Sequence, residues 1–257
     1  MVQEITNQTT EKKDEIIVKV EDLHKAYFLG KNAIPALRGV SFELKRGELV
    51  SIMGPSGCGK TTLLNIIGGI DRPDRGRVQF EGRELTTLSD NQLADLRLEN
   101  ISFVFQFYNL LPLLSAKENV EVPLVFNGVS KSKREKRAKE LLELVGLKGR
   151  EEHLPTELSG GEQQRVSICR AMANDPDLMI CDEPTGDLDS NSAKVILRLL
   201  HDLNKRLGMT ILMVTHDRRI ALICDRMLKM LDGKIIDEEQ TPGLTGSLLD
   251  EDIELVE

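Results

Sequence analysis

The chain has 257 residues, of which 40% are hydrophobic and 30% charged, so it can bury a sizeable core and wholesale disorder is excluded. Its net charge is −8, and eight acids against one base give −7 to residues 233–257, which leaves −1 for residues 1–232. A nearly neutral body lacks the basic stripe of a dedicated nucleic-acid binder, so we expect no nucleic-acid partner.

No segment is suited to spanning a membrane or to directing secretion. The longest stretch without charges, residues 100–116, has 17 residues and contains polar residues and a proline, whereas a spanning helix needs roughly 20 mostly apolar residues. The N-terminus has no apolar signal region. Four cysteines with no zinc spacing favour buried thiols in a reducing cytosol over a disulfide framework (Cys58, Cys169, Cys181 and Cys224).

In chain order, polar residues 1–14 predict a flexible N-terminal extension. Short apolar runs then predict strands at residues 16–20, 40–44 and 49–53. The third run ends at Gly54, where a glycine-rich loop begins, and residues 61–67 predict a helix that Gly68 stops. Strand, glycine loop and helix in this order are the context in which a phosphate-binding motif has meaning.

A mostly helical insert is predicted at about residues 85–160. Ser89 and Gln92 form a capping-box pattern before residues 93–99, a strand edge is expected at 102–105, and apolar residues recur at helical spacing over 131–147. Beyond Gly161, helices alternate with continuous apolar strands at 178–181 and 210–214, which is typical of a central parallel sheet. The order therefore predicts a parallel α/β core interrupted by the insert.

Residues 54–61 (GPSGCGKT) match the phosphate-binding pattern GxxxxGK[ST]. Glycines let backbone N–H groups converge on an anion, and the helix start adds its positive end. Lys60 is expected to reach the β- and γ-phosphates, and the Thr61 hydroxyl to bind Mg²⁺. The motif predicts a P-loop NTPase and leaves kinases, GTPases and motor ATPases open. The predicted nucleotide contacts here are Gly54, Pro55, Ser56, Gly57, Cys58, Gly59, Lys60, Thr61 and Thr62.

Cys58, inside this loop, has two interpretations. The start of a helix lowers the pKa of a thiol, which would make Cys58 reactive. Alternatively, the side chain only packs in place of a similarly sized serine, and this is favoured because the chemistry needs no sulfur.

Two carboxylates follow the apolar run 178–181. Asp182 stands at the end of the predicted strand, where it would hold the metal, and Glu183 is next in line to polarise the attacking water. The alternative is an ordinary acidic loop, but the P-loop lysine elsewhere in the chain favours the catalytic interpretation.

Residues 158–165 (LSGGEQQR) place Ser159, Gly160 and Gly161 before a helical run, followed by Glu162. This is a second candidate anion-binding helix start. One ATP needs only one P-loop, so we expect this stretch to touch the γ-phosphate of ATP bound to another copy. A nucleotide-dependent, head-to-tail homodimer follows. The alternative is an ordinary N-cap followed by glycines.

Together these motifs, over about residues 16–233, resemble the ATP-binding cassette (ABC) family, outside which LSGGEQQR is very uncommon. The resemblance implies an α/β fold, namely a RecA-like P-loop core with an N-terminal antiparallel β subdomain and an inserted helical subdomain. It implies an ATP-binding domain at residues 15–233 and an acidic C-terminal tail at 234–257.

The resemblance also implies roles for single residues. Tyr27 would stack on adenine, Gln106 would be the Q-loop glutamine that contacts Mg²⁺ and water, and His216 would hold the γ-phosphate. Residues 187–189 resemble the D-loop that crosses the dimer interface. The alternatives are a surface aromatic for Tyr27, a polar strand end for Gln106 and a helix cap for His216.

Within the family, SIMGPSGCGKTTLLNIIGGID and DEPTGDLDS resemble the branch that works with macrolide exporters, lipoprotein-release systems, peptide-resistance exporters and the cell-division ABC complex. This implies an ATPase, peripheral on the cytoplasmic face of the cell membrane, that powers a separate integral membrane permease through dimer closure. The apolar run at residues 107–114 would line a groove for a cytosolic helix of the permease or form local core. A soluble ABC ATPase and a non-transporting mechanical coupler stay open as alternatives.

Overall fold

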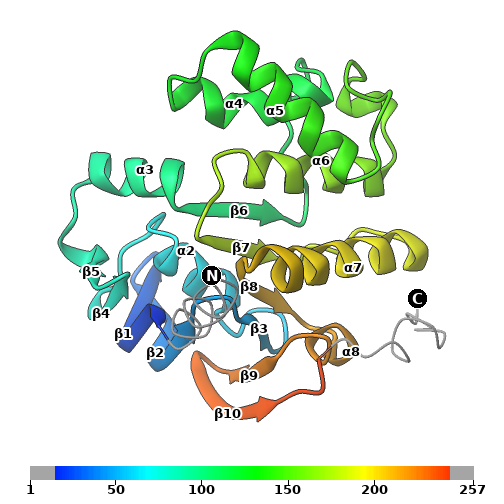
Figure 1. Ribbon diagram of the computed structural model, residues 1–257. Coiled ribbons are helices and arrows are strands. Elements are labelled where there is room, and N and C mark those ends of the chain that lie inside the picture. The colour runs from blue at the N-terminus through cyan, green and yellow to red at the C-terminus, as the bar shows by residue number, and fades with distance from the viewer. Residues whose placement is uncertain (1–14, 244–257) are drawn as a thin grey trace, which may run out of the picture.

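The computed structural model describes residues 15–243 (Figure 1). The predicted N-terminal extension at residues 1–14, and the part of the acidic tail from residue 244 onward, lie outside the described residues. Among the helices of residues 15–243, none combines the length and the apolar character needed to cross a membrane.

A six-stranded sheet forms the centre of the fold, in the order β10-β9-β3-β8-β7-β6. The neighbouring pairs from β9 to β6 are parallel, and β10 runs antiparallel to β9. The strand bounds are β3 Leu49–Met53, β6 Ile101–Phe105, β7 Leu178–Asp182, β8 Thr210–Thr215, β9 Arg226–Leu231 and β10 Lys234–Gln240. β8 is buried at every position, as a continuous apolar strand between two covered faces must be. The carboxyl ends of β3, β8 and β7 therefore meet at one edge.

A second, antiparallel sheet has the order β2-β1-β4-β5. Its strands are β1 Ile16–Leu29, β2 Asn32–Lys45, β4 Arg75–Phe80 and β5 Arg83–Glu84. The sheet packs with helix α2 (Lys60–Ile67) and the central sheet in one hydrophobic cluster that includes Val20, Leu64 and Ile52. The α/β fold with an antiparallel β subdomain is thus confirmed, although β1 and β2 are much longer than the runs at 16–20 and 40–44 predicted.

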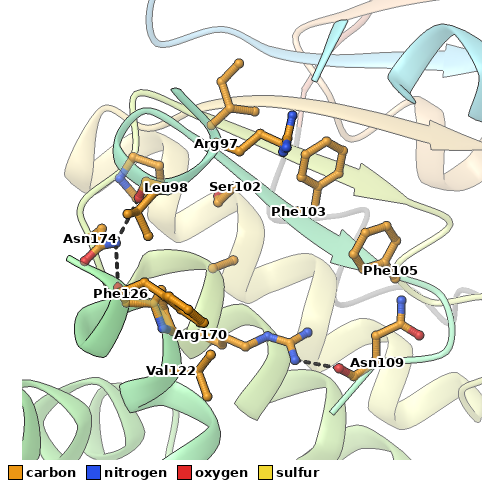
Figure 2. Close-up of a pocket in the computed structure, with 14 residues that line it drawn as sticks. Arg97, Leu98, Ser102, Phe103, Phe105, Asn109, Val122, Phe126, Arg170 and Asn174 are labelled. Carbon is orange, nitrogen blue, oxygen red and sulfur yellow. Dashed lines mark hydrogen bonds between the residues drawn. The ribbon is translucent and has the colours of Figure 1, made fainter. Parts of the chain in front are cut away.

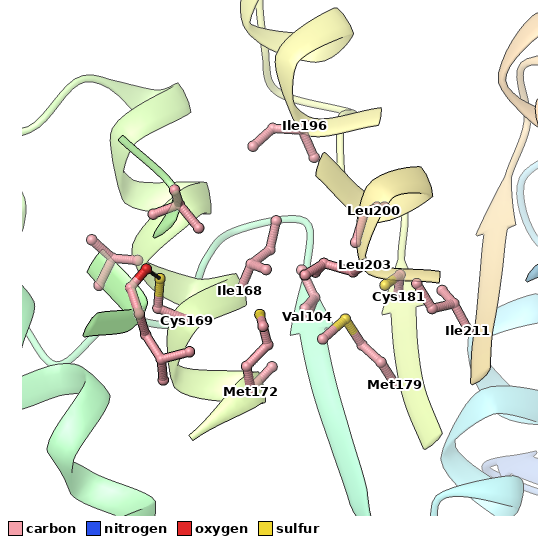
Figure 3. Packing of buried hydrophobic residues seen from close by; sticks show 14 of the residues in the cluster. Val104, Ile168, Cys169, Met172, Met179, Cys181, Ile196, Leu200, Leu203 and Ile211 are labelled. Carbon is pink, nitrogen blue, oxygen red and sulfur yellow. Dashed lines mark hydrogen bonds between the residues drawn. The ribbon is translucent and has the colours of Figure 1, made fainter. Parts of the chain in front are cut away.

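Helices α4, α5 and α6 lie together on one side of the central sheet, drawn in green in Figure 1. The helical bounds are α3 Asp90–Glu99, α4 Ala116–Phe126, α5 Lys131–Leu144, α6 Gly160–Met172, α7 Ser190–Leu207 and α8 Arg218–Ala221, with short 3₁₀ turns η1 Leu85–Thr87 and η2 Pro155–Glu157. The capping box of Ser89 and Gln92 starts α3 as predicted. Figure 3 shows Ile168 and Met172 of α6 packed toward Val104 of β6, which belongs to the central sheet although it lies within the range predicted for the insert.

The central sheet continues beyond residue 233, where the acidic tail was expected to begin. β10 pairs with β9 from Lys234 to Gln240 across the turn at Asp232 and Gly233, both of which have positive φ. Lys229 of β9 pairs with Asp237 and Glu239, and Arg226 pairs with Glu238, so three acids of the expected tail belong to a strand. The first part of the predicted tail is therefore an edge strand of the domain.

Candidate ATP-binding site

The P-loop joins β3 to α2, and neighbouring backbone leaves no room for a side chain at two of its glycines. A Cβ atom on Gly54 would overlap the carbonyl of Met230, and one on Gly59 would overlap the carbonyl of Ala36. The ammonium of Lys60 is buried and donates to the carbonyls of Gly54 (2.8 Å) and Pro55 (3.2 Å). The cradle is thus shaped by the strands packed behind it, and Lys60 lies folded over the loop.

Four of the predicted catalytic and metal-binding side chains meet in front of Lys60. The Lys60 Nζ lies 3.6 Å from Glu183 Oε1, and His216 Nδ1 lies 2.8 Å from Glu183 Oε2. The Thr61 hydroxyl donates to Asp182 Oδ1 at 3.3 Å. These contacts unite the ends of β3, β7 and β8, which are adjacent in the sheet. Glu183 has φ +46°, a conformation that non-glycine residues seldom adopt outside sites that require it.

The electrostatics of the carboxylate pair favour a bound cation. Burial raises the pKa of Asp182, and the charge of Glu183 adds to this, whereas the Thr61 hydroxyl and Lys60 act in the opposite direction. A carboxylate and a hydroxyl are the hard oxygen ligands that Mg²⁺ accepts, with the remaining positions left to water and phosphate. The residues present therefore fit Mg²⁺, even though no cluster of three or more His, Cys, Asp or Glu occurs in residues 15–243.

Gln106 follows β6 directly, and its contact with Mg²⁺ stays a prediction. Its Nε2 donates to Asp187 Oδ1 at 3.3 Å, so the predicted Q-loop contacts the predicted D-loop at residues 187–189. Phe107 follows Gln106 in the chain. The next two residues have positive φ, +59° at Tyr108 and +50° at Asn109. The loop after Gln106 is thus held in an unusual conformation.

Tyr27 stands at the edge of the P-loop site. It is 43% exposed, its hydroxyl donates to Asp71 Oδ2 at 2.8 Å, and the Lys25 ammonium lies 5.3 Å from the ring centre. Burial raises the pKa of its phenol, the Asp71 contacts add to the rise, and Thr62 at the start of α2 acts against it. The ring therefore lies beside α2 with a surface free to stack, and adenine stacking stays a prediction.

Ser159, at the start of the predicted phosphate-contacting stretch (residues 158–165), has no hydrogen bond to this cluster within residues 15–243. Ser159 caps α6, and its hydrogen bonds go to Glu162, whose carboxylate accepts from the Ser159 amide and hydroxyl, both at 2.9 Å. Gly160 approaches Tyr108, and Gly161 approaches Ser192 of α7, closely enough that an added Cβ would crowd each neighbour. On a single chain, none of the recorded contacts of Ser159 reaches the P-loop.

Cys58 is buried within the loop, 4% exposed. Burial raises the pKa of its thiol, although Lys60 and backbone N–H groups act to lower it. The expectation of a lowered pKa at the helix start is therefore wrong, because desolvation outweighs the local positive charge. The alternative of simple packing is supported.

Two residues of the site were not singled out from the sequence. Gln164 Nε2 donates to the carbonyls of Pro184 (2.6 Å) and Phe105 (3.3 Å), which joins the ends of β7 and β6. Arg170 donates to the carbonyls of Asn109 (2.6 Å, dashed in Figure 2) and Tyr108 (2.8 Å). Both side chains come from α6, and only their place in the stretch after LSGG hinted at a role.

Several known proteins are similar to this chain. ABC transporter H family member 2 from Dictyostelium discoideum is 51% identical over 89% of this chain, which spans 46% of that protein. The macrolide export ATP-binding/permease protein MacB from Marinobacter nauticus is 44% identical over 86% of this chain, which spans 34% of MacB. A dimeric structure of the ATP-binding cassette MJ0796 in a post-hydrolysis state, bound to ADP and Pi, is 44% identical with a TM-score of 0.82 and covers 88% of this chain and 100% of its own. The model of the ABC transporter family matches residues 37–186, and the chain therefore belongs to this family of ATP-binding ATPases.

Proposed function

We propose that two copies of this chain close head to tail around two Mg-ATP molecules and that this closure drives a separate membrane permease. The observation that carries the proposal is the incomplete site. Lys60, Asp182, Glu183 and His216 converge on one P-loop, whereas the hydrogen bonds of the Ser159 hydroxyl go to Glu162 of its own helix. A second copy would supply the missing donor, and the dimeric MJ0796 cassette, similar to this chain, supports that arrangement.

The chemistry of the closed site follows from the side chains. Lys60 and the backbone N–H groups of the P-loop would neutralise charge on the transferring phosphoryl group. Glu183 would orient the attacking water, and His216 would hold the Glu183 carboxylate in place. Mg²⁺, held by Thr61 and Asp182, would supply electrostatic stabilisation of the phosphate oxygens. Gln106 would become a further ligand of Mg²⁺ once its hydrogen bond to Asp187 has broken.

The permease is proposed from the relatives. The name of MacB joins an ATP-binding part to a permease part, and this chain spans 34% of its length. We therefore place the protein on the cytoplasmic face of the cell membrane, bound to an integral membrane permease. Export of a lipoprotein, a peptide or a macrolide-like compound is the proposed type of transport.

Replacement of Glu183 tests the shared site. Glu183→Gln removes the base that orients water but keeps ATP binding, so hydrolysis should slow by about 10²-fold or more. Dimers should then accumulate on size-exclusion chromatography with Mg-ATP. The exposed Glu140, replaced in the same way, provides the control and should leave turnover and elution unchanged. A Glu183→Gln protein that binds ATP and stays monomeric contradicts the proposal.

A further inference from the structure

The loop between α2 and β4 binds the outer part of β1 through two carboxylates. Asp74 Oδ2 accepts from the Ala26 amide at 2.7 Å, and the Asp74 amide donates to the His24 carbonyl at 2.9 Å. Asp71, three residues earlier, accepts from the Tyr27 hydroxyl. The segment of β1 that carries Tyr27 is therefore fastened to this loop through both its backbone and its side chain.

Asp71 uses both of its carboxylate oxygens. Oδ2 accepts from the Tyr27 hydroxyl at 2.8 Å, whereas Oδ1 accepts from the Lys25 ammonium at 2.8 Å and from the Arg72 amide at 2.7 Å. Burial would raise the pKa of this carboxyl, but hydrogen bonds from Lys25, Tyr27 and Arg72 outweigh it and lower the pKa. Three donors thus hold one ionised carboxylate, which in turn holds the phenol.

Lys25 is bound on the other side of the same carboxylate. Its side chain is 12% exposed, and its ammonium also donates to the Arg72 carbonyl at 2.7 Å. The ammonium lies over the Tyr27 ring, within the range of a cation–π contact. A base can therefore stack only on the part of the ring that Lys25 does not cover.

The helix that starts at the P-loop also supports Asp71. The amides of Ile70 and Asp71 donate to the Asn65 carbonyl of α2 at 2.8 and 3.1 Å. Although burial raises the pKa of the Tyr27 phenol, a hydrogen bond with Thr62 in the first turn of α2 acts to lower it. One helix thus presents the phosphate-binding turn at its start and anchors the support of Tyr27 near its end.

We propose that Asp71 is the positioning residue for the base of the nucleotide, because it holds the Tyr27 ring at a fixed place relative to the start of α2. This inference rests on the proposed function, since it requires ATP at this P-loop. Base–aromatic stacking contributes affinity, and a ring that is already held in place loses less freedom when the base arrives. Asp71 itself does not touch the nucleotide and acts through Tyr27.

The affinities of the full chain for ATP and for inorganic tripolyphosphate, both with Mg²⁺, test this inference. Tripolyphosphate has the three phosphates without a base, and its affinity is measured by displacement of a ribose-labelled fluorescent ATP analogue. Tyr27→Leu should weaken ATP binding about tenfold, as for loss of one base–aromatic stack. Asp71→Leu should weaken it about fivefold, as for loss of one hydrogen bond. Neither variant should change the affinity for tripolyphosphate.

A double-mutant cycle separates positioning from a general loss of structure. In the Tyr27→Leu background, Asp71→Leu should have no further effect on ATP affinity, because the ring that it positions is gone. Tyr27→Phe keeps the ring and loses the hydroxyl, so it should also weaken ATP binding about fivefold, and it replaces Asp71→Leu if that variant does not fold. Asp95→Leu, in an exposed position on α3, is the control and should bind both ligands as the native chain does.

Three outcomes would overturn the inference. They are native ATP affinity in Asp71→Leu or Tyr27→Phe, equal losses of affinity for ATP and tripolyphosphate, and an effect of Asp71→Leu that persists in the Tyr27→Leu background. Because these affinities belong to the single chain, they are independent of dimer formation by the Glu183→Gln protein. Failure of base positioning thus leaves the shared ATP site standing, and a Glu183→Gln protein that stays monomeric leaves base positioning standing.

Discussion

Two helices of this chain begin next to glycines, but the first turn of α2 is uncapped, whereas the first turn of α6 is capped by side chains. The start of α2 has Gly59 at the N-cap, with no side-chain cap and no acid in the first turn, so its N–H groups are available to an anion. The start of α6 is closed by Ser159 and Glu162, which satisfy each other and the backbone in a capping box.

The difference determines what a phosphate would compete with at each helix start. At α2, no side-chain cap competes with a phosphate for the N–H groups of the first turn. At α6, a phosphate oxygen must compete with the Glu162 carboxylate for the Ser159 hydroxyl. A phosphate would therefore meet uncapped N–H groups at α2, and a hydroxyl already bonded to a carboxylate at α6.

Replacing Ser159 tests this difference between the helix starts and should have the largest effect on turnover. Ser159→Arg removes the donor and inserts bulk at the proposed dimer contact, so turnover should fall about 10²–10³-fold, as for loss of one transition-state donor. Affinity of the isolated chain for ATP should not change, because Ser159 makes no recorded contact with the P-loop. Phosphate release measures turnover, and equilibrium binding of a fluorescent ATP analogue measures the affinity for ATP.

Ser89→Arg provides the matched control for that prediction. Ser89 caps α3 with the same type of capping box, so the variant loses an equivalent cap at a site remote from the P-loop. It should keep its turnover. Full activity of Ser159→Arg, or an equal fall in ATP affinity, would show that the two helix starts do not have the different roles assigned above.

The features predicted best from the sequence are those that local chemistry determines. The helix expected at residues 61–67 is observed from Lys60 to Ile67, and the capping box at Ser89 lies where its pattern placed it. Both depend on residues within one turn. The proximity of Asp182 and Thr61 could also be predicted from the sequence, because parallel strands bring their carboxyl ends to one edge.

Features that depend on distant residues were missed. The acidic composition of residues 234–240 gave no sign of a strand, because its partner β9 supplies Lys229. For Cys58, the less favoured alternative of a lowered thiol pKa rested on the helix start alone, whereas burial by surrounding residues raises that pKa. The contacts of Arg170 and Gln164 connect α6 to loops about 20 to 60 residues away in sequence, which no local pattern reveals.

Two glycines of the P-loop, Gly57 and Gly59, differ in the space around them and so test how far β2 confines the start of α2. Gly57 has φ +79° with no atom within 4 Å of an added Cβ, whereas Gly59 has φ +105° and a Cβ there would overlap the Ala36 carbonyl. Gly57→Ala should therefore cost about 1–2 kcal/mol, from backbone strain alone. Gly59→Ala should cost a further 1–3 kcal/mol, because the backbone of β2 must move. Urea denaturation gives both values, and equal losses would mean that β2 does not confine the loop.

The smallest expected effect concerns the charge that closes α6. Hydrogen bonds from the Ser159 amide, then from its hydroxyl, lower the pKa of Glu162 below 4.5, against the effect of burial. A carboxylate whose pKa is lowered in the folded state stabilises the protein above its unfolded pKa, and this contribution disappears as pH falls through the folded value. Glu162→Gln keeps the shape of the capping box, which α3 forms with Gln92, so only the charge is removed. We expect a loss of about 0.5 kcal/mol in unfolding free energy at pH 7, typical of a carboxylate at an exposed helix start. The loss should shrink as pH is lowered below 4.5 in urea titrations. A loss of equal size at every pH would assign the effect to geometry, and the competition between Glu162 and phosphate for Ser159 would then not depend on charge.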